Sequence, residues 1–241
     1  MLGTIVNSIA IIVGSLIGII FSKKISAEIS DVISSAAGVI TLIIGFQMAF
    51  QMQNIIYIAI SLILGGILGA WWDIDGKILS IGRFLEHHFG KKNISEGNES
   101  KFAYAFLNAS VLFCVGAMAI VGSFKAGTEG DYTMLYTKSV LDGFMSLVFS
   151  AAMGIGTAFS ALTIFVYQGL LTLGSAFIKP WVSPQMIAEL TGIGGAFVIM
   201  IGINILDLKK LKTANYLPGL IVLVFFVLAD PFLQKIAAFL V

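Results

Sequence analysis

Apolar stretches of membrane-spanning length recur along this chain of 241 residues and constrain its fold more than any other feature. A bilayer core of about 30 Å is crossed by a helix of about 20 mostly apolar residues. Eight stretches approach or meet that length: Gly3–Phe21, Ile33–Phe50, Ile55–Trp72, Ala103–Phe124, Val140–Met153, Thr157–Phe177, Met186–Leu206 and Tyr216–Pro231. The sequence therefore predicts an all-α, polytopic transmembrane bundle of about eight spans, with residues 1–241 forming a single integral membrane domain.

The composition agrees with lipid as the main solvent and main partner of the chain. Apolar residues make up 58% and charged residues 11%, against about 45–50% and about 25% in soluble domains. So few charges cannot cover a surface that faces water. The formal net charge of +1 gives no support for nucleic-acid binding, and we expect none.

The basic residues indicate how the spans are oriented. If the chain begins outside and crosses eight times, ten of the fourteen Lys and Arg residues fall on the cytoplasmic side, as the positive-inside rule requires. If residues 140–177 crossed only once, the cytoplasmic count would fall to nine. Lys23 and Lys24 follow the first stretch, whereas a signal peptide carries its basic residues in front. We therefore predict a permanent first span and both termini outside.

The longest connection, Asp73–Lys101, is the segment expected to have structure in water, and we place it in the cytoplasm. Within it, Ile78, Ile81, Leu85 and Phe89 recur at spacings of three and four residues. That spacing predicts a short amphipathic helix lying on the membrane surface.

Two groups of three stretches share a pattern that is typical of an internal repeat. The second and seventh stretches each carry two glycines seven positions apart and an amide two positions later, and the first and sixth each begin with Gly-Thr. The matched residues are Gly38, Gly45 and Gln47 with Gly195, Gly202 and Asn204, and Gly3-Thr4 with Gly156-Thr157. The second group begins five spans after the first, an odd number, so the two groups would lie in opposite orientations. Inverted repeats are a frequent plan of transporters; the alternative is a chance similarity between glycine-rich helices.

Gly154-Ile-Gly156 joins two apolar stretches with almost no polar linker, and Val140–Met153 before it is short for a full crossing. A helix interrupted at membrane depth is tolerated where it is buried in protein or lines a water-filled cavity. One interpretation is therefore a broken or re-entrant helix pair near 140–177, whose exposed helix ends bind an ion or polar solute. The other is a tight turn between two ordinary spans.

Charged side chains are nearly absent from the predicted spans, whereas neutral polar side chains are common. Asp142 is the candidate for a buried carboxylate, although Lys138 one turn before it would also make an ion pair at the membrane interface. Amides and hydroxyls either bind a solute or hydrogen-bond across helices as structural contacts. The candidate pathway residues are Asn7, Gln47, Asn108, Asp142, Gly154, Gly156, Ser160, Gln168 and Asn204.

Motifs for catalysis and metal binding are not found in the sequence. There is no Gly-x-Ser-x-Gly, no His-Glu-x-x-His and no phosphate-binding loop. The two histidines, His87 and His88, are adjacent, so on a helix they point about 100° apart and cannot form a metal site by themselves. We expect no enzymatic activity, no metal and no other cofactor.

Several strings resemble the YqgA/YdfK family of prokaryotic membrane proteins. They are Gly3-Thr-Ile-Val-Asn7, Leu112–Ser123, Leu141-Asp-Gly143, Gly154–Ser160 and Tyr167-Gln-Gly169. The resemblance covers essentially the whole chain, and Phe-Cys-Val-Gly-x-Met at 113–118 is its most specific part. The family has no assigned function. The resemblance therefore implies a polytopic inner-membrane protein and supplies no substrate, cofactor or mechanism.

These observations lead to two hypotheses about function. The first is a small secondary transporter or channel for an ion or small polar solute in the prokaryotic cytoplasmic membrane. Tight bundling or a homodimer is favoured by two small-residue patterns in the chain, Gly14-x-x-x-Gly18 and Gly65-x-x-x-Gly69. The second is a non-transporting scaffold or partner subunit that acts through the 73–101 loop.

Overall fold

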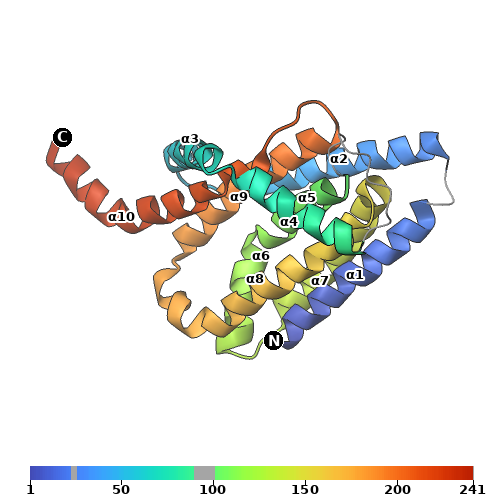
Figure 1. Cartoon of the computed structure of the whole chain (residues 1–241). Helices are drawn as coiled ribbons and strands as arrows, with labels where there is room; N and C mark the ends of the chain where they lie inside the picture. Colours follow the sequence, from blue (N-terminus) through green and yellow to red (C-terminus); the bar gives the residue numbers. More distant parts are fainter. Residues whose placement is uncertain (23–25, 90–100, 241) are drawn as a thin grey trace.

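The structure is a computed structural model that describes residues 1–22, 26–89 and 101–240, and the regular elements in this part of the chain are all helical. The α-helices are α1 Leu2–Ser22, α2 Ala27–Ala49, α3 Ile55–Trp71, α4 Ile74–Phe89, α5 Lys101–Cys114, α6 Ala117–Thr128, α7 Thr133–Met153, α8 Gly156–Ile178, α9 Pro184–Ile205 and α10 Pro218–Leu240. Two short 3₁₀ turns, η1 Lys179–Trp181 and η2 Thr213–Tyr216, precede α9 and α10 (Figure 1). The all-α prediction is confirmed.

The helices have the character of a polytopic membrane bundle. Among the described residues, five helices are long and apolar enough to cross a membrane alone, namely α1, α2, α8, α9 and α10. Two bent pairs, α3 with α4 at 58° and α5 with α6 at 61°, raise the number of candidate spans to seven. Helix α7 has 21 residues and thus the length of a span, but it carries two charges, Lys138 and Asp142. The predicted count of eight spans is reached only if α7 also crosses the membrane.

Helix α1 runs parallel to α7 and antiparallel to α8. Gly3 and Gly18, near the two ends of α1, lie against Leu135 and Ser150 at the corresponding ends of α7. The contacts that fix the direction of α8 are Met1 with Gly169 and Ser8 with Ala161. Figure 1 shows these three helices together, with α1 on the outside of the bundle. Helices α7 and α8 therefore run in opposite directions.

Other packed pairs have equally definite directions. Helix α9 lies antiparallel to α2, and α10 lies antiparallel to α3, whereas the bent α5–α6 pair runs parallel to α8. The contacts that define these directions are Gly38 with Leu206 and Gly195 with Ala49, then Tyr57 with Asp230 and Gly65 with Gly219, and finally Phe102 with Gly156 and Gly127 with Ser175.

Small residues let these backbones approach closely, as the small-xxx-small patterns predict. A Cβ atom on Gly14 would come within 2.1 Å of the Gly143 carbonyl oxygen, and one on Gly69 within 1.8 Å of the Asn215 carbonyl oxygen. Gly14 and Gly69 are therefore used for packing inside the chain. A homodimer, if formed, needs another surface.

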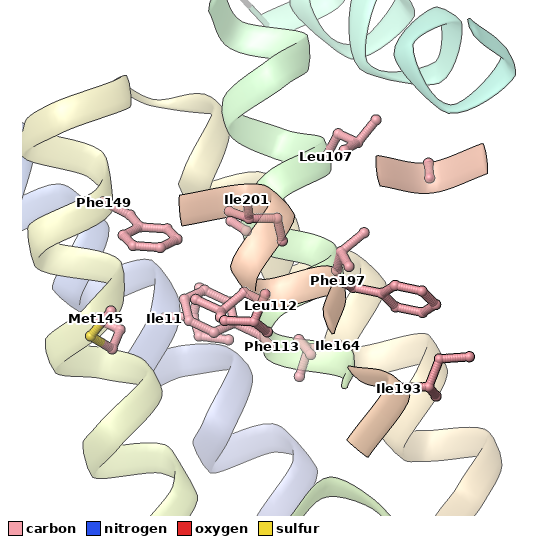
Figure 2. Packing of buried hydrophobic residues seen from close by; sticks show 14 of the residues in the cluster. Ile11, Leu107, Leu112, Phe113, Met145, Phe149, Ile164, Ile193, Phe197 and Ile201 are labelled. Carbon is pink, nitrogen blue, oxygen red and sulfur yellow. The ribbon is translucent and has the colours of Figure 1, made fainter. Parts of the chain in front are cut away.

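The hydrophobic core lies where α1, α5, α7, α8 and α9 meet. Figure 2 shows Ile11, Phe113 and Ile164 close together, with Met145 and Phe149 of α7 to one side. The rings of Phe113 and Phe149 stack with centroids 6.3 Å apart. This packed apolar layer separates polar side chains near the two ends of α1 and α8.

Several helix boundaries differ from the sequence prediction, such as the start of α2 at Ala27 and the end of α10 at Leu240, and two differences bear on the site. Helix α7 begins at Thr133, seven residues before the predicted Val140, because charged residues break the apolar stretch without breaking the helix. The predicted span Ala103–Phe124 is interrupted at Val115–Gly116, where Gly116 adopts φ 147°, which favours glycine. No polar residue marks this interruption in the sequence.

The predicted boundary at Gly154–Gly156 is present, since α7 ends at Met153 and α8 begins at Gly156. Residues 140–177 lie in two long antiparallel helices, as in the tight-turn interpretation. Among the described residues, the helix pairs bent at a break are α3–α4 and α5–α6 instead.

The predicted short helix of the 73–101 loop is present as α4. The rest of that loop, residues 90–100 with Lys91 and Lys92, and also Lys23 and Lys24, lie outside the described residues.

Candidate functional site

Four buried polar side chains from α1, α7 and α8 meet inside the bundle, and we call them the polar network: Asn7, Lys138, Asp142 and Gln168. The Asn7 amide nitrogen donates to Asp142 Oδ2 at 3.0 Å and to Gln168 Oε1 at 3.2 Å. The Lys138 ammonium pairs with the same carboxylate oxygen of Asp142. Asn7 and Gln168 are 0% exposed, so the network is shielded from the surroundings of the bundle.

The network lies well inside α7 rather than at its end. Asp142 is nine residues from Thr133 at the start of α7, or about 14 Å at a rise of 1.5 Å per residue. The sequence hypothesis placed the Lys138–Asp142 pair close to the lipid headgroups, because it started the helix at Val140. The longer α7 moves this pair one to two turns deeper, where an ionisable side chain is a functional candidate by default.

Two polar atoms of the network have no hydrogen-bond partner among the residues that the structure describes. The Asn7 carbonyl oxygen Oδ1 is an unused acceptor, and the Gln168 amide nitrogen Nε2 is an unused donor. Leaving a buried polar atom unpaired costs about 1–3 kcal/mol. The network therefore has free capacity for a molecule that both donates and accepts hydrogen bonds.

The interruption between α5 and α6 lies against α2 and α9, where Gly116 is near Met48 and Val115 packs on Gly194. The parallel packing of α5–α6 on α8 joins Ser110 to Thr163 and brings Gly127 against Ser175, so Gly116 falls between these two levels. The Cys114 thiol is within electrostatic range of Lys138 and Asp142. Helix α6 starts without a side-chain cap, and its first N–H groups form the positive end of a helix dipole. Interrupted helices near the midplane form the binding sites of many transporters.

Four other predicted residues lie outside the network, on α5, at the start of α8 and in the turn before α8. Buried Asn108 approaches Met153 Sδ at 4.0 Å, and Ser160 donates to the Thr157 carbonyl oxygen at 2.7 Å. Gly156 permits close packing, since a Cβ there would lie 2.1 Å from the Phe102 carbonyl oxygen. Gly154 ends α7 with φ 96°. The two glycines thus shape the turn between α7 and α8.

The remaining two predicted residues, Asn204 and Gln47, do not belong to the polar network. Asn204 binds both backbone groups of Leu211, at 2.9 Å and 2.7 Å, and so closes the turn after α9. Gln47 is exposed on α2, because it lies two residues, or about 200°, from Gly45, which faces α9. The structure therefore brings together Asn7, Asp142 and Gln168 of the nine predicted residues.

A second buried polar group, at the start of α3 and α9, was not predicted as a site. Glu189 is 0% exposed and accepts hydrogen bonds from the backbone N–H groups of Gln53 and Asn54 at 3.2 Å and 2.7 Å. Asp230 accepts from the Tyr57 hydroxyl and from Gln185. Glu189 thus holds the start of α3. The sequence shows both acids but not that α9 and α10 turn them inward.

A cavity of about 230 Å³ lies at the opposite end of α3, where α4 begins. Its charged lining consists of Asp73, Asp75, Arg83 and Lys212. Asp75 is held in place by the backbone N–H of Ala214, 3.2 Å from its Oδ1. This cavity is built from the surface helix α4 and the turn before α10.

An all-helical bundle with several apolar helices of membrane-spanning length has the character of an integral membrane protein, and comparison with known proteins agrees. The chain belongs to the family described as "Protein of unknown function (DUF554)", whose model matches residues 2–228. This confirms the resemblance seen in the sequence.

Two curated proteins are similar over nearly their whole length. "Uncharacterized membrane protein YdfK" of Bacillus subtilis (strain 168) is 35% identical over 226 residues, covering 92% of this chain and 93% of the relative. "Uncharacterized protein YqgA" of Escherichia coli (strain K12) is 25% identical over 220 residues, covering 91% and 93%. No solved structure is significantly similar to the chain.

Proposed function

We propose that this protein is a small secondary transporter or channel for an ion or small polar solute, with the polar network as its binding site. The observation that carries the proposal is the network itself: an ion pair and two amides at membrane depth, with one unused donor and one unused acceptor. Unpaired buried polar atoms are uncommon, and a bound ligand that uses them is one explanation for their presence. No catalytic role and no cofactor form part of the proposal.

The helix directions support the eight-span topology. Taking α1 as the reference, α7 runs with it, and α8 and the α5–α6 pair run against it. A chain that crosses back and forth must alternate in direction, so a crossing is needed between α6 and α8. Helix α7 has the direction and the 21-residue length for it. Both termini then lie on one side, which the positive-inside count makes the outside of a cytoplasmic membrane.

The same directions support the inverted repeat. Each helix of the first group packs against its proposed equivalent in the second group, as α1 with α8, α2 with α9 and α3 with α10, and each pair is antiparallel. Two units related by a two-fold axis in the membrane plane produce such pairs. The polar network then lies at the interface between the units, where transporters of this plan bind their substrates.

The charged cavity beneath α4 favours the second hypothesis, a partner subunit or scaffold. Three of its four charged residues, Asp73, Asp75 and Arg83, belong to the 73–101 loop itself. Its acidic and basic side chains suit a charged segment of another protein. A homodimer would instead use apolar faces such as that of α3, where Ile63 and Ile67 are both 62% exposed.

Flux through purified protein in liposomes tests the transport proposal. A panel of monovalent cations, small anions and neutral solutes is measured first with the unmodified protein, and flux of at least one member is expected. Absence of flux from stably folded protein across the panel would reject transport.

The site is tested with two amide substitutions of the same kind. Gln168→Leu removes the unused donor and is expected to lower the flux at least tenfold. Gln47→Leu changes an exposed amide and is expected to leave the flux unchanged, provided that both variants elute as folded protein. Equal flux through the two variants would show that the polar network is not the binding site.

A further inference from the structure

Buried stripes of α1 and α8 face each other and carry polar side chains with unused atoms. The α1 stripe contains Thr4, Asn7, Ile11 and Ser15, and the α8 stripe contains Thr157, Ser160, Ile164 and Gln168, all buried. Their spacings of three and four residues place each set on one helix face. The contact between Ser8 and Ala161 lies in the middle of both stripes.

The two stripes correspond under the predicted repeat. Adding 153 to a residue number converts Thr4 to Thr157 and Ile11 to Ile164, with the residue type unchanged in both cases. The same shift converts Ser15 to Gln168. Two of the three polar pairs carry unused buried atoms on both members: Thr4 Oγ1 with Thr157 Oγ1, and Ser15 Oγ with Gln168 Nε2. In the third pair, Asn7 has an unused Oδ1, whereas the Ser160 hydroxyl donates to the Thr157 carbonyl oxygen.

Because α1 and α8 are antiparallel, the facing side chains of the two stripes form successive layers along the bundle. At the end of the bundle where α1 begins, Thr4 leads to Asn7 and Gln168, which are hydrogen-bonded to each other. Between the two ends lie Ile11 and Ile164, which belong to the apolar core cluster that also contains Phe113 (Figure 2). Beyond them, Ser15 of α1 comes level with the start of α8, where Thr157 and Ser160 lie.

We propose that Ser15, Thr157 and Ser160 form a second binding site, equivalent to the Asn7–Gln168 site by the inverted repeat, and that Ile11 and Ile164 close the route between the two sites. This inference rests on the proposed transport function and adds the second site and the barrier. Each site opens toward its own side of the membrane, and a solute passes between them when the two isoleucines separate.

The unused atoms indicate the chemistry of the solute. The first site offers an acceptor at Asn7 Oδ1 and a donor at Gln168 Nε2, and the second site offers the hydroxyls of Ser15 and Thr157, which act as either. Lys138 and Asp142 cancel each other's charge, and the second site has no charged member. The pair of sites therefore fits a small neutral solute that both donates and accepts hydrogen bonds, since a bare ion in such surroundings is costly.

Thiol accessibility tests the two sites without knowledge of the solute. Cys114 is the single cysteine of the chain, so Cys114→Ala gives a cysteine-free background. Thr4→Cys and Thr157→Cys are the matched pair, Ile11→Cys probes the barrier, and Glu129→Cys in an exposed turn is the positive control. A membrane-impermeant methanethiosulfonate is applied to right-side-out and to inside-out vesicles.

Thr4→Cys and Thr157→Cys are expected to react from opposite sides, and Ile11→Cys at least tenfold more slowly than either. Adding Ile164→Ala to the Thr157→Cys variant should allow reaction from both sides, whereas Ile164→Val should not. Reaction of both threonine positions from the same side, or of neither while Glu129→Cys reacts, would overturn the two-site arrangement. The labelling pattern decides this inference, and flux in liposomes decides transport, so either one can fail without the other.

Discussion

Removing the negative charge of the buried ion pair is the most informative perturbation of this fold. The side chains of Lys138 and Asp142 are 7% and 11% exposed. Asp142→Asn keeps the shape of the side chain and leaves the Lys138 ammonium without a counter-ion at membrane depth. Breaking a buried pair in this way costs about 3–5 kcal/mol. We expect a loss of unfolding free energy of that size.

Replacing both partners separates the charge effect from a packing effect. Lys138→Met with Asp142→Leu removes both charges and keeps apolar bulk. Asn7 then loses one acceptor but keeps its hydrogen bond to Gln168. Exchanging a buried pair for apolar side chains is often neutral or stabilising, so the double variant is expected to be more stable than Asp142→Asn.

The exposed pair of Lys179 and Glu129 provides the control. Its side chains are 50% and 49% exposed and lie 2.7 Å apart. Glu129→Gln is expected to change the unfolding free energy within experimental error, because water and salt screen such pairs. The hydrogen bond from Lys179 lowers the pKa of Glu129, so the small contribution of this pair is present at neutral pH and is lost as the pH falls through that lowered pKa.

Reversible unfolding in mixed micelles, followed by circular dichroism, measures all of these variants under one condition. The reasoning is refuted if Asp142→Asn costs less than about 1 kcal/mol, since a buried charge cannot lose its partner so cheaply. It is also refuted if the double variant is as unstable as Asp142→Asn, because packing rather than charge would then explain the loss.

Three further substitutions test the packing around the site. Gly14→Ala should abolish folding or lower the melting temperature sharply, because its Cβ would meet the Gly143 carbonyl at 2.1 Å, whereas Gly174→Ala should be tolerated, since its nearest neighbour is the flexible end of a side chain at 3.2 Å. Gly116→Ala forces a strained φ of 147° and should cost about 1–3 kcal/mol and reduce flux. Asn204→Leu should cost about 1–3 kcal/mol by freeing backbone groups of the turn after α9, while flux per folded molecule stays unchanged.

The sequence predicts the helices well where hydropathy alone decides their limits. Helices α1, α3 and α9 lie close to the predicted stretches, because lipid requires an apolar run of fixed length. The sequence prediction fails at the start of α7. Lys138 and Asp142 lower the hydropathy there, but they lie one helical turn apart and neutralise each other's charge, so the helix continues. The prediction also fails at Gly116, because an interruption inside an apolar run changes backbone conformation without changing polarity.

The candidate site was predictable in its residue types but not in its membership. Asn7 and Gln168 stand out as amides in apolar surroundings, as do Gln47 and Asn204. Which of them meet depends on helix rotation and on contacts between α1 and α8, which are 161 residues apart at the Asn7–Gln168 bond. Local periodicity does not contain that information.

The weak apolar character of α7 has a consequence for how the protein enters the membrane. A charged residue at the centre of a helix opposes insertion by about 2.5–3.5 kcal/mol, and α7 is absent from the helices that are apolar enough to insert alone. Asn7 of α1 donates a hydrogen bond to the Asp142 carboxylate, and the ribosome synthesises α1 far earlier than α7. We therefore expect α1 to serve during biogenesis as a docking surface on which the late, poorly inserting α7 completes the bundle.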